Sequence, residues 1–191
     1  MNEFAFVFGN GQTRLDFNTR TLSSYGKIFG CNRMYTDPNV DVIISVDPGP
    51  TRLIQEHEGT YEHYTRPQYT NNISFPCDNR YQGYSSGPNA VAIAAGKRFP
   101  YIFIIGMDLT SNTGFHNNIY AGTEFYKSDT EPPTYYGNWV SQISHIAENY
   151  SHIRLIHVNP LSGFTPTEWQ QMSNFSIMTK IEFLTFVGID K

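Results

Sequence analysis

The chain of 191 residues is long enough for one domain with a sizeable apolar core, and we treat residues 1–191 as a single domain. A formal net charge of -4 with only 16% charged residues gives no basic surface for a nucleic acid backbone, so we expect no nucleic acid partner. The N-terminal sequence lacks a basic segment followed by a small-residue cleavage site, and no apolar run is long enough to cross a bilayer. These features predict a cytoplasmic protein without an integral membrane segment.

An almost uninterrupted apolar run at residues 3–8 ends in Gly9-Asn10-Gly11, which predicts a central strand, buried on both faces, and a loop after it. Ligands of open α/β sheets lie beyond the carboxyl ends of the strands, where a glycine-rich loop can aim its N–H groups at a phosphate or carboxylate. We therefore expect this tripeptide to bind an anion, with Arg14 adding positive charge. The tripeptide is equally typical of a plain tight turn, and without a third glycine it is a weak dinucleotide-binding motif.

Two further strands are predicted at residues 27–31 and 41–46, and a polar side chain follows each of them. Asn32 follows the first and Asp47 the second, as Asn10 follows the strand at the start of the chain. The carboxyl ends of parallel strands share one edge of a sheet. These side chains therefore predict a polar pocket at that edge.

Residues 51–64 have the apolar spacing of a helix, and a short strand is expected near residues 73–75. His57 and His63 lie among glutamates in this stretch. The cluster is compatible with a metal site, but its pattern favours a solvated helix face. The two cysteines form neither a metal-binding motif nor a disulfide framework, and Cys31 is expected to be a buried thiol.

An alanine-rich helix is predicted at residues 90–96, with Ser85 and a proline at its start. Its N-terminus, together with the hydroxyls of Ser85 and Ser86, is a second element suited to an anion. A buried strand is predicted at residues 101–105, and Asp108 follows it. We expect this carboxylate at the same edge of the sheet as the polar side chains of the earlier strands.

Residues 109–136 show no periodicity and contain glycines and prolines, which predicts a long loop. A loop of this length inside a compact domain is either a functional lid or disordered. Its many Tyr, Phe and His residues favour an aromatic lid that orders over a ligand.

Beyond the lid, the pattern predicts a helix at residues 138–149, a strand at residues 153–158 and a helix that begins within residues 165–169. The apolar face of the first of these helices consists of Val140, Ile143, Ile146 and Ala147. Residues 175–187 are compatible with either a helix or a strand.

Five motifs, taken in chain order, resemble the bacterial lipooligosaccharide α-2,3-sialyltransferases. They are Phe-Gly-Asn-Gly at 8–11, Gly-Cys-Asn at 30–32, the Ser-Gly helix start at 86–94, Ile-Gly-Met-Asp at 105–108 and a closing strand that ends in Asn159-Pro160. The chain also resembles a broader Rossmann-like set that includes a pterin pyrophosphokinase-like group. The resemblance implies an α/β, Rossmann-like fold with a mainly parallel sheet flanked by helices and an aromatic lid insertion at 109–136.

The resemblance further implies a nucleotide-sugar donor, which in that family is CMP-sialic acid, and transfer to a glycan acceptor with inversion and without an essential metal or cofactor. By position, Asn10 and Asn32 match the asparagines that contact the donor, with Gly9, Gly11 and Arg14 in the same loop region. Ser86 and Gly87 match the serine-glycine pair at the mouth of the helix, and Asp108 lies where the ribose is approached. The sequence does not determine the oligomeric state, and a homo-oligomer stays open.

The chain departs from the family where the catalytic residues are expected. The family has a catalytic histidine just before the helix that precedes the last strand, and this chain has Thr134-Tyr135-Tyr136 there. We therefore predict His116 as a relocated general base, with Tyr120 and Tyr135 near the departing phosphate. Two alternatives stay open: a nucleotide-binding protein without turnover, and a Mg²⁺-dependent phosphotransferase with Asp47 and Asp108 as ligands.

Overall fold

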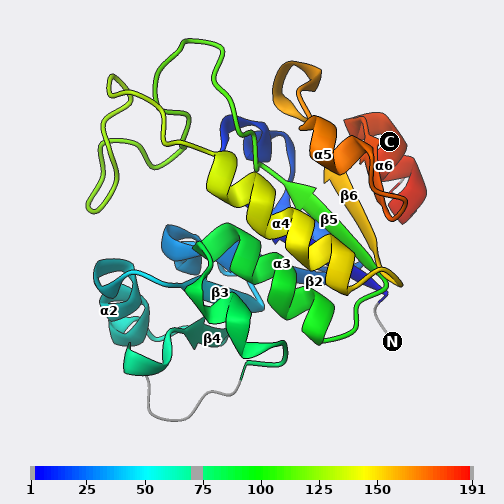
Figure 1. Ribbon diagram of the computed structural model, residues 1–191. Coiled ribbons are helices and arrows are strands. Elements are labelled where there is room, and N and C mark those ends of the chain that lie inside the picture. The colour runs from blue at the N-terminus through cyan, green and yellow to red at the C-terminus, as the bar shows by residue number, and fades with distance from the viewer. Residues whose placement is uncertain (1–2, 70–74, 190–191) are drawn as a thin grey trace.

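A computed structural model describes residues 3–69 and 75–189 of the protein. Within these residues seven strands form one sheet, all parallel, in the order β4-β3-β2-β1-β5-β6-β7 (Figure 1). The strands are β1 (Phe4–Phe8), β2 (Lys27–Cys31), β3 (Val42–Ser45), β4 (Glu62–Thr65), β5 (Tyr101–Ile105), β6 (Arg154–Val158) and β7 (Phe175–Met178). This arrangement confirms the predicted Rossmann-like α/β fold.

Helices cover both faces of the sheet. They are α1 (Thr19–Leu22), α2 (Pro48–Glu56), α3 (Ser86–Gly96), α4 (Gly137–Asn149), α5 (Thr167–Gln170) and α6 (Lys180–Val187). Figure 1 shows α3 and α4 lying side by side across one face, with α5 next to α4. None of the helices in the described ranges has the length and apolarity needed to cross a membrane.

The continuous apolar runs of the strands result from burial on both faces. In β1, Ala5 and Val7 belong to the core under α3 and α4, whereas Phe6 and Phe8 belong to the opposite core with α6. Successive side chains of a strand point to opposite faces, so a strand covered on both sides has no polar face.

The chain starts at the centre of the sheet, and later strands are added on both sides of β1. Strands β1 to β4 run outward to one edge, and the chain then returns to place β5 on the other side of β1. Such a switch point leaves a crevice at the carboxyl ends of the two central strands. Here the loops after β1 and β5 pack together, and the N–H of Gly9 donates to the carbonyl of Ile105 at 2.8 Å.

Two predicted elements differ from the structure. The helix expected over residues 51–64 is α2, which ends at Glu56, and β4 follows it as an edge strand. The strand was missed because it has only four residues and begins with the polar side chains of Glu62, which is exposed, and His63, which is half-buried. Of the strand expected near residues 73–75, residues 73 and 74 lie outside the described part, and Phe75 packs on the ring of Tyr64 without strand structure.

The C-terminal ambiguity is resolved because residues 175–187 contain both kinds of element. Strand β7 ends at Met178 and α6 begins at Lys180. Thr179 between them caps the helix: its side chain accepts from the N–H of Glu182, and the Glu182 carboxylate accepts from the N–H of Thr179. The predicted apolar face of α4 is confirmed, since all four of its residues are buried.

Candidate functional site

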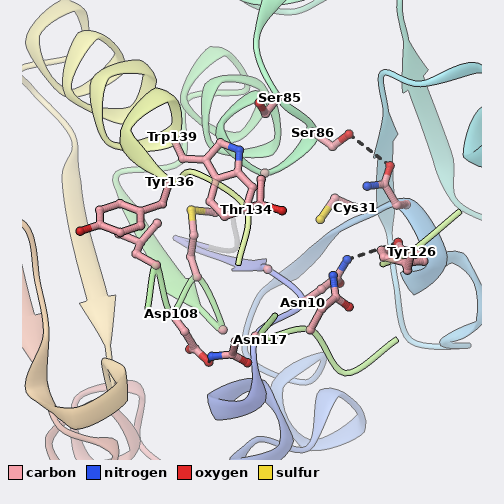
Figure 2. Close-up of a pocket in the computed structure, with 18 of the residues that line it drawn as sticks. Asn10, Cys31, Ser85, Ser86, Asp108, Asn117, Tyr126, Thr134, Tyr136 and Trp139 are labelled. Carbon is pink, nitrogen blue, oxygen red and sulfur yellow. Dashed lines mark hydrogen bonds between the residues drawn. The ribbon is translucent and has the colours of Figure 1, made fainter. Parts of the chain in front are cut away.

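A cavity of about 500 Å³ lies at the carboxyl edge of the sheet (Figure 2). Its walls come from the residues after β1, β2, β3, β4 and β5, from the starts of α3 and α4, and from residues 109–136. Asn10, Asn32, Asp47 and Asp108 all line it. The prediction that the polar residues after these strands share one pocket is therefore confirmed.

The glycines of the first loop bring backbone segments together rather than offering N–H groups to a ligand. The N–H groups of Gly9 and Gly11 donate to the carbonyls of Ile105 and Gly106, at 2.8 and 2.7 Å. A side chain at Gly11 would overlap the carboxylate of Asp108. The prediction of outward-facing N–H groups is wrong for these two glycines, and the loop instead presents the amide of Asn10 to the cavity.

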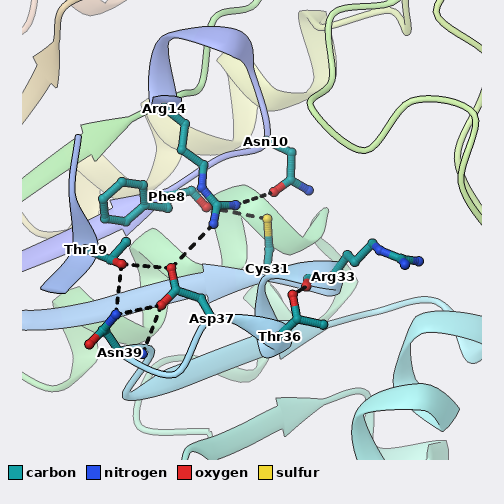
Figure 3. A network of polar contacts seen from close by, with 9 residues as sticks. All are labelled: Phe8, Asn10, Arg14, Thr19, Cys31, Arg33, Thr36, Asp37 and Asn39. Atoms are coloured by element: carbon teal, nitrogen blue, oxygen red, sulfur yellow. Dashed lines mark hydrogen bonds and ion pairs between the residues drawn. The ribbon is translucent and has the colours of Figure 1, made fainter. Parts of the chain in front are cut away.

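Arg14 does not line the cavity, although the sequence predicted it as part of the anion site. It is 7% exposed and lies beneath the loop in a 3-10 helix, Gln12–Asp16. Its Nη1 donates to Oδ1 of Asn10 at 3.3 Å (Figure 3). The guanidinium therefore contacts a lining residue from behind.

Asn32 and the start of α3 form the next part of the wall. Asn32 adopts a left-handed backbone conformation with φ of 51° and accepts a hydrogen bond from the Ser86 hydroxyl at 3.1 Å. In the first turn of α3, Pro88 has no N–H and the N–H of Asn89 donates to the carbonyl of Ser85. The N–H groups of Ser86 and Gly87 are therefore the donors that the helix leaves for a ligand.

Asp108 connects three segments around the cavity. Its carboxylate accepts hydrogen bonds from the Thr13 N–H at 3.2 Å, from the Thr13 hydroxyl and from Nδ2 of Asn117 at 2.9 Å. The side chain is buried, and both of its oxygens have partners. The sequence identified this residue as a site residue but gave no sign of these contacts.

Residues 109–136, the segment predicted to be a lid, extend beyond the carboxyl ends of the strands in Figure 1. Its backbone is joined to the first loop by a hydrogen bond from the Ile119 N–H to the Asn10 carbonyl at 2.8 Å. The hydroxyl of Tyr126 accepts from the Arg33 N–H at 3.2 Å and lies 3.5 Å from Nδ2 of Asn10. The segment is thus held against the loops after β1 and β2.

The three predicted catalytic residues have different locations. His116 lines the cavity, and burial together with the nearby Lys127 lowers the pKa of its imidazole. Tyr120 does not line the cavity; its ring lies over the Arg14 guanidinium at 5.6 Å. Tyr135 is 76% exposed and is also absent from the wall. Of the predicted set, only the histidine is in a position to reach a ligand in this cavity.

Several lining residues were not identified as site residues from the sequence, among them Arg66, Tyr126, Lys127 and Trp139. Arg66 follows β4, so it was missed together with that strand. The aromatic composition of the lid pointed to the right segment but not to Tyr126, whose burial raises its pKa and keeps the hydroxyl protonated. Trp139 lies in the first turn of α4, where a helical pattern gives no signal for a cavity.

The histidines near β4 have separate partners. His57 Nδ1 lies 3.1 Å from the Tyr61 hydroxyl, and His63 Nε2 lies 2.9 Å from the Ser45 hydroxyl. In residues 3–69 and 75–189, no group of three or more His, Cys, Asp or Glu side chains is placed to hold a metal ion. Cys31 is buried as predicted, and burial raises its thiol pKa to about 11.

A cavity at the switch point of a parallel sheet defines the class of the protein: an α/β protein of the Rossmann-like type with a pocket at the carboxyl edge of the sheet. No family model and no curated protein sequence matches the chain. Solved structures do match its fold. The monofunctional α-2,3-sialyltransferase Cst-I of Campylobacter jejuni superposes with a TM-score of 0.52 at 14% identity, over 81% of this chain and 75% of that one.

The sialyltransferase CstII of the same organism, in complex with the substrate analogue cytidine-5'-monophosphate, gives a TM-score of 0.50 at 13% identity. That match covers 81% of this chain and 79% of the other. At these identities the comparisons establish a shared fold. The resemblance to the pterin pyrophosphokinase-like group has no such support and stays a prediction.

Proposed function

We propose that this protein is a glycosyltransferase whose donor is a cytidine nucleotide sugar and whose acceptor is a glycan. One observation carries the proposal: Asn10, Asn32 and Ser86, from three separate elements, converge on one cavity at the carboxyl edge of the sheet. The same fold occurs in a sialyltransferase solved with cytidine monophosphate. A volume of about 500 Å³ is also within the usual range for a small-molecule site.

The donor phosphate would bind where amides and cations surround the cavity. Nδ2 of Asn10, the N–H groups at the start of α3 and the ammonium of Lys127 are donors on this wall. The contacts of Tyr126 with Arg33 and Asn10 use its hydroxyl oxygen as an acceptor, so its proton is available for a phosphate oxygen. These groups would stabilise the negative charge of the departing nucleotide without a metal ion.

In the proposed reaction, the acceptor hydroxyl oxygen attacks the anomeric carbon from the face opposite the phosphate. The bond from that carbon to the phosphate oxygen breaks, the nucleotide leaves with the electron pair, and the configuration inverts. His116 would take the hydroxyl proton. Because burial and Lys127 lower the pKa of His116, its imidazole is neutral at pH 7 and is able to accept a proton.

The test is calorimetric titration with CMP in the presence of EDTA, followed by assays of donor hydrolysis and transfer with CMP-sugars. The wild-type protein should bind CMP without metal and release it from a CMP-sugar. His116→Ala should lower kcat by a factor of about 10²–10⁴ with CMP affinity retained. His152→Ala, which changes an exposed histidine, serves as the matched control. Failure of the wild-type protein to bind CMP or any other cytidine nucleotide would refute the proposal.

A nucleotide-binding protein without turnover is the second candidate. The observation that favours it is the exposed Tyr135, which stands where the sialyltransferase family that this chain resembles has its catalytic histidine. In that case CMP binds with the same dependence on Asn10 and Asn32, and no donor is consumed. The hydrolysis assay therefore separates the two candidates.

A further inference from the structure

The guanidinium of Arg14 is enclosed beneath the first loop. It lies 5.7 Å from the centre of the Phe8 ring and 5.6 Å from that of Tyr120 (Figure 3 shows the Phe8 side). Aromatic faces attract a cation, and the attraction grows when water is excluded. Both rings therefore hold the charged plane in one place.

Asp37 forms an ion pair with the nitrogen of the guanidinium that does not contact Asn10. Its Oδ2 lies 3.9 Å from Nη2 of Arg14 and accepts from the Thr19 hydroxyl at 2.9 Å. Its Oδ1 accepts from the N–H and Nδ2 of Asn39, at 2.9 and 3.1 Å. With both oxygens occupied, the carboxylate has little freedom to swing, and Figure 3 shows the resulting chain from Asn39 through Asp37 to Arg14 and Asn10.

This series of polar contacts decides which end of the Asn10 amide faces the cavity. A guanidinium carries donors only, so the atom of Asn10 that faces Nη1 at 3.3 Å must be the oxygen. The opposite orientation would place two donors against each other. Nδ2 is therefore turned to the cavity side, where its neighbour is the Tyr126 hydroxyl at 3.5 Å.

We propose that Arg14 is a positioning residue that holds Asn10 with its amide donor toward the ligand, and so makes this loop select a phosphate oxyanion. The proposal rests on the proposed function, because it assigns the phosphate as the ligand group that the loop binds. Asp37 contributes to the same positioning, since it pairs with the Arg14 guanidinium. Arg14 itself does not line the cavity and acts through Asn10.

A double-mutant cycle tests the proposal, with the Kd for CMP measured by calorimetry for wild type, Asn10→Ala, Arg14→Met and the double variant. Each single substitution should weaken binding about tenfold or more, the factor expected for the loss of a charge-assisted hydrogen bond. The double variant should bind no more weakly than Asn10→Ala alone, because Arg14 acts only through that side chain. Arg14→Lys, which keeps a charged donor, should recover part of the affinity.

Two further variants distinguish a specific effect on CMP binding from a loss of folding. Arg20→Met removes the same charge from an exposed position and should bind CMP like wild type. Asn10→Asp keeps an oxygen toward Arg14 but places a second oxygen toward the ligand, so binding should weaken more than tenfold in a folded protein. Equal CMP affinity of Asn10→Asp and wild type, or losses that add in the cycle, would overturn the proposal while leaving the proposed function intact.

If the wild-type protein binds no CMP, the proposed function fails, and NMR of the ligand-free protein decides this inference separately. The side-chain NH₂ signals of Asn10, assigned by their loss in Asn10→Ala, should shift in Arg14→Met and stay in place in Arg20→Met. Signals that are unchanged in Arg14→Met would show that the amide is not held by Arg14.

Discussion

Replacing Gly9 by alanine should destabilise the protein through a collision of backbone segments at the switch point. An ideal Cβ at Gly9 overlaps the carbonyl oxygen of Gly106 and lies 2.9 Å from its carbon and 3.1 Å from Cα of Met107. Carbon atoms pack best about 3.5–4.0 Å apart, so the loops after β1 and β5 must separate. None of the atoms met belongs to a side chain, and therefore no rotamer change relieves the contact.

The expected magnitude follows from three effects. Overpacking of this kind costs about 1–3 kcal/mol. Weakening the hydrogen bond from Gly9 to Ile105 removes up to about 1 kcal/mol more. Alanine restricts the unfolded chain and returns about 0.4–1 kcal/mol. The net loss should be about 1–3 kcal/mol.

The assay is urea unfolding followed by circular dichroism, with Gly83→Ala as the matched control. Gly83 also lines the cavity, but no atom lies within 4 Å of a Cβ built there and its φ is not positive. With an m value of about 2 kcal/mol per molar urea, Gly9→Ala should lower the midpoint by about 0.5–1.5 M. Gly83→Ala should leave the midpoint unchanged or raise it. Equal midpoints for the two variants would refute the argument that Gly9 is required by the approach of two backbones.

Three further predictions concern buried polar groups. Asp108→Asn leaves one of the donors from Thr13 or Asn117 without an acceptor, which should lower the free energy of unfolding by about 1–3 kcal/mol; urea unfolding measures this, and stability equal to wild type would contradict it. The pKa of Cys31, raised to about 11 by burial, predicts that this thiol reacts with a disulfide reagent at pH 8 far more slowly in the native protein than in the urea-unfolded protein. The measurement uses Cys77→Ser, which leaves Cys31 as the single thiol, and rapid labelling of this variant in its native state would disprove the prediction. Burial lowers the pKa of His157 from about 6.5 in the unfolded chain to about 4, so between pH 6.5 and 4 only the unfolded chain takes up this proton. Its contribution to stability is full above pH 6.5 and is lost as the pH falls through that window; an imidazole NMR titration midpoint near 6.5 would contradict it.

The sequence by itself determined the central strands, the helix after Ser85 and the buried face of α4. These elements are visible locally because burial on both faces produces a continuous apolar run, and burial on one face of a helix produces a 3.6-residue period. The polar residues that follow the strands could be identified for the same reason. Once the strands are parallel, Asn10, Asn32, Asp47 and Asp108 must share an edge.

Only the tertiary structure decided what individual side chains do at that edge. Strand β4 is polar and short, and its strand structure depends on pairing with β3. Contacts between residues far apart in the chain assign the roles of the others: Asn10 meets Tyr126 across 116 positions, and Asp108 meets Thr13 across 95. The sequence predicted Arg14 as a ligand contact because a basic residue beside a glycine-rich loop is typical of an anion-binding site. In the structure Arg14 is buried between two aromatic rings and contacts Asn10 rather than the cavity. This position results from tertiary packing, which no local sequence pattern predicts.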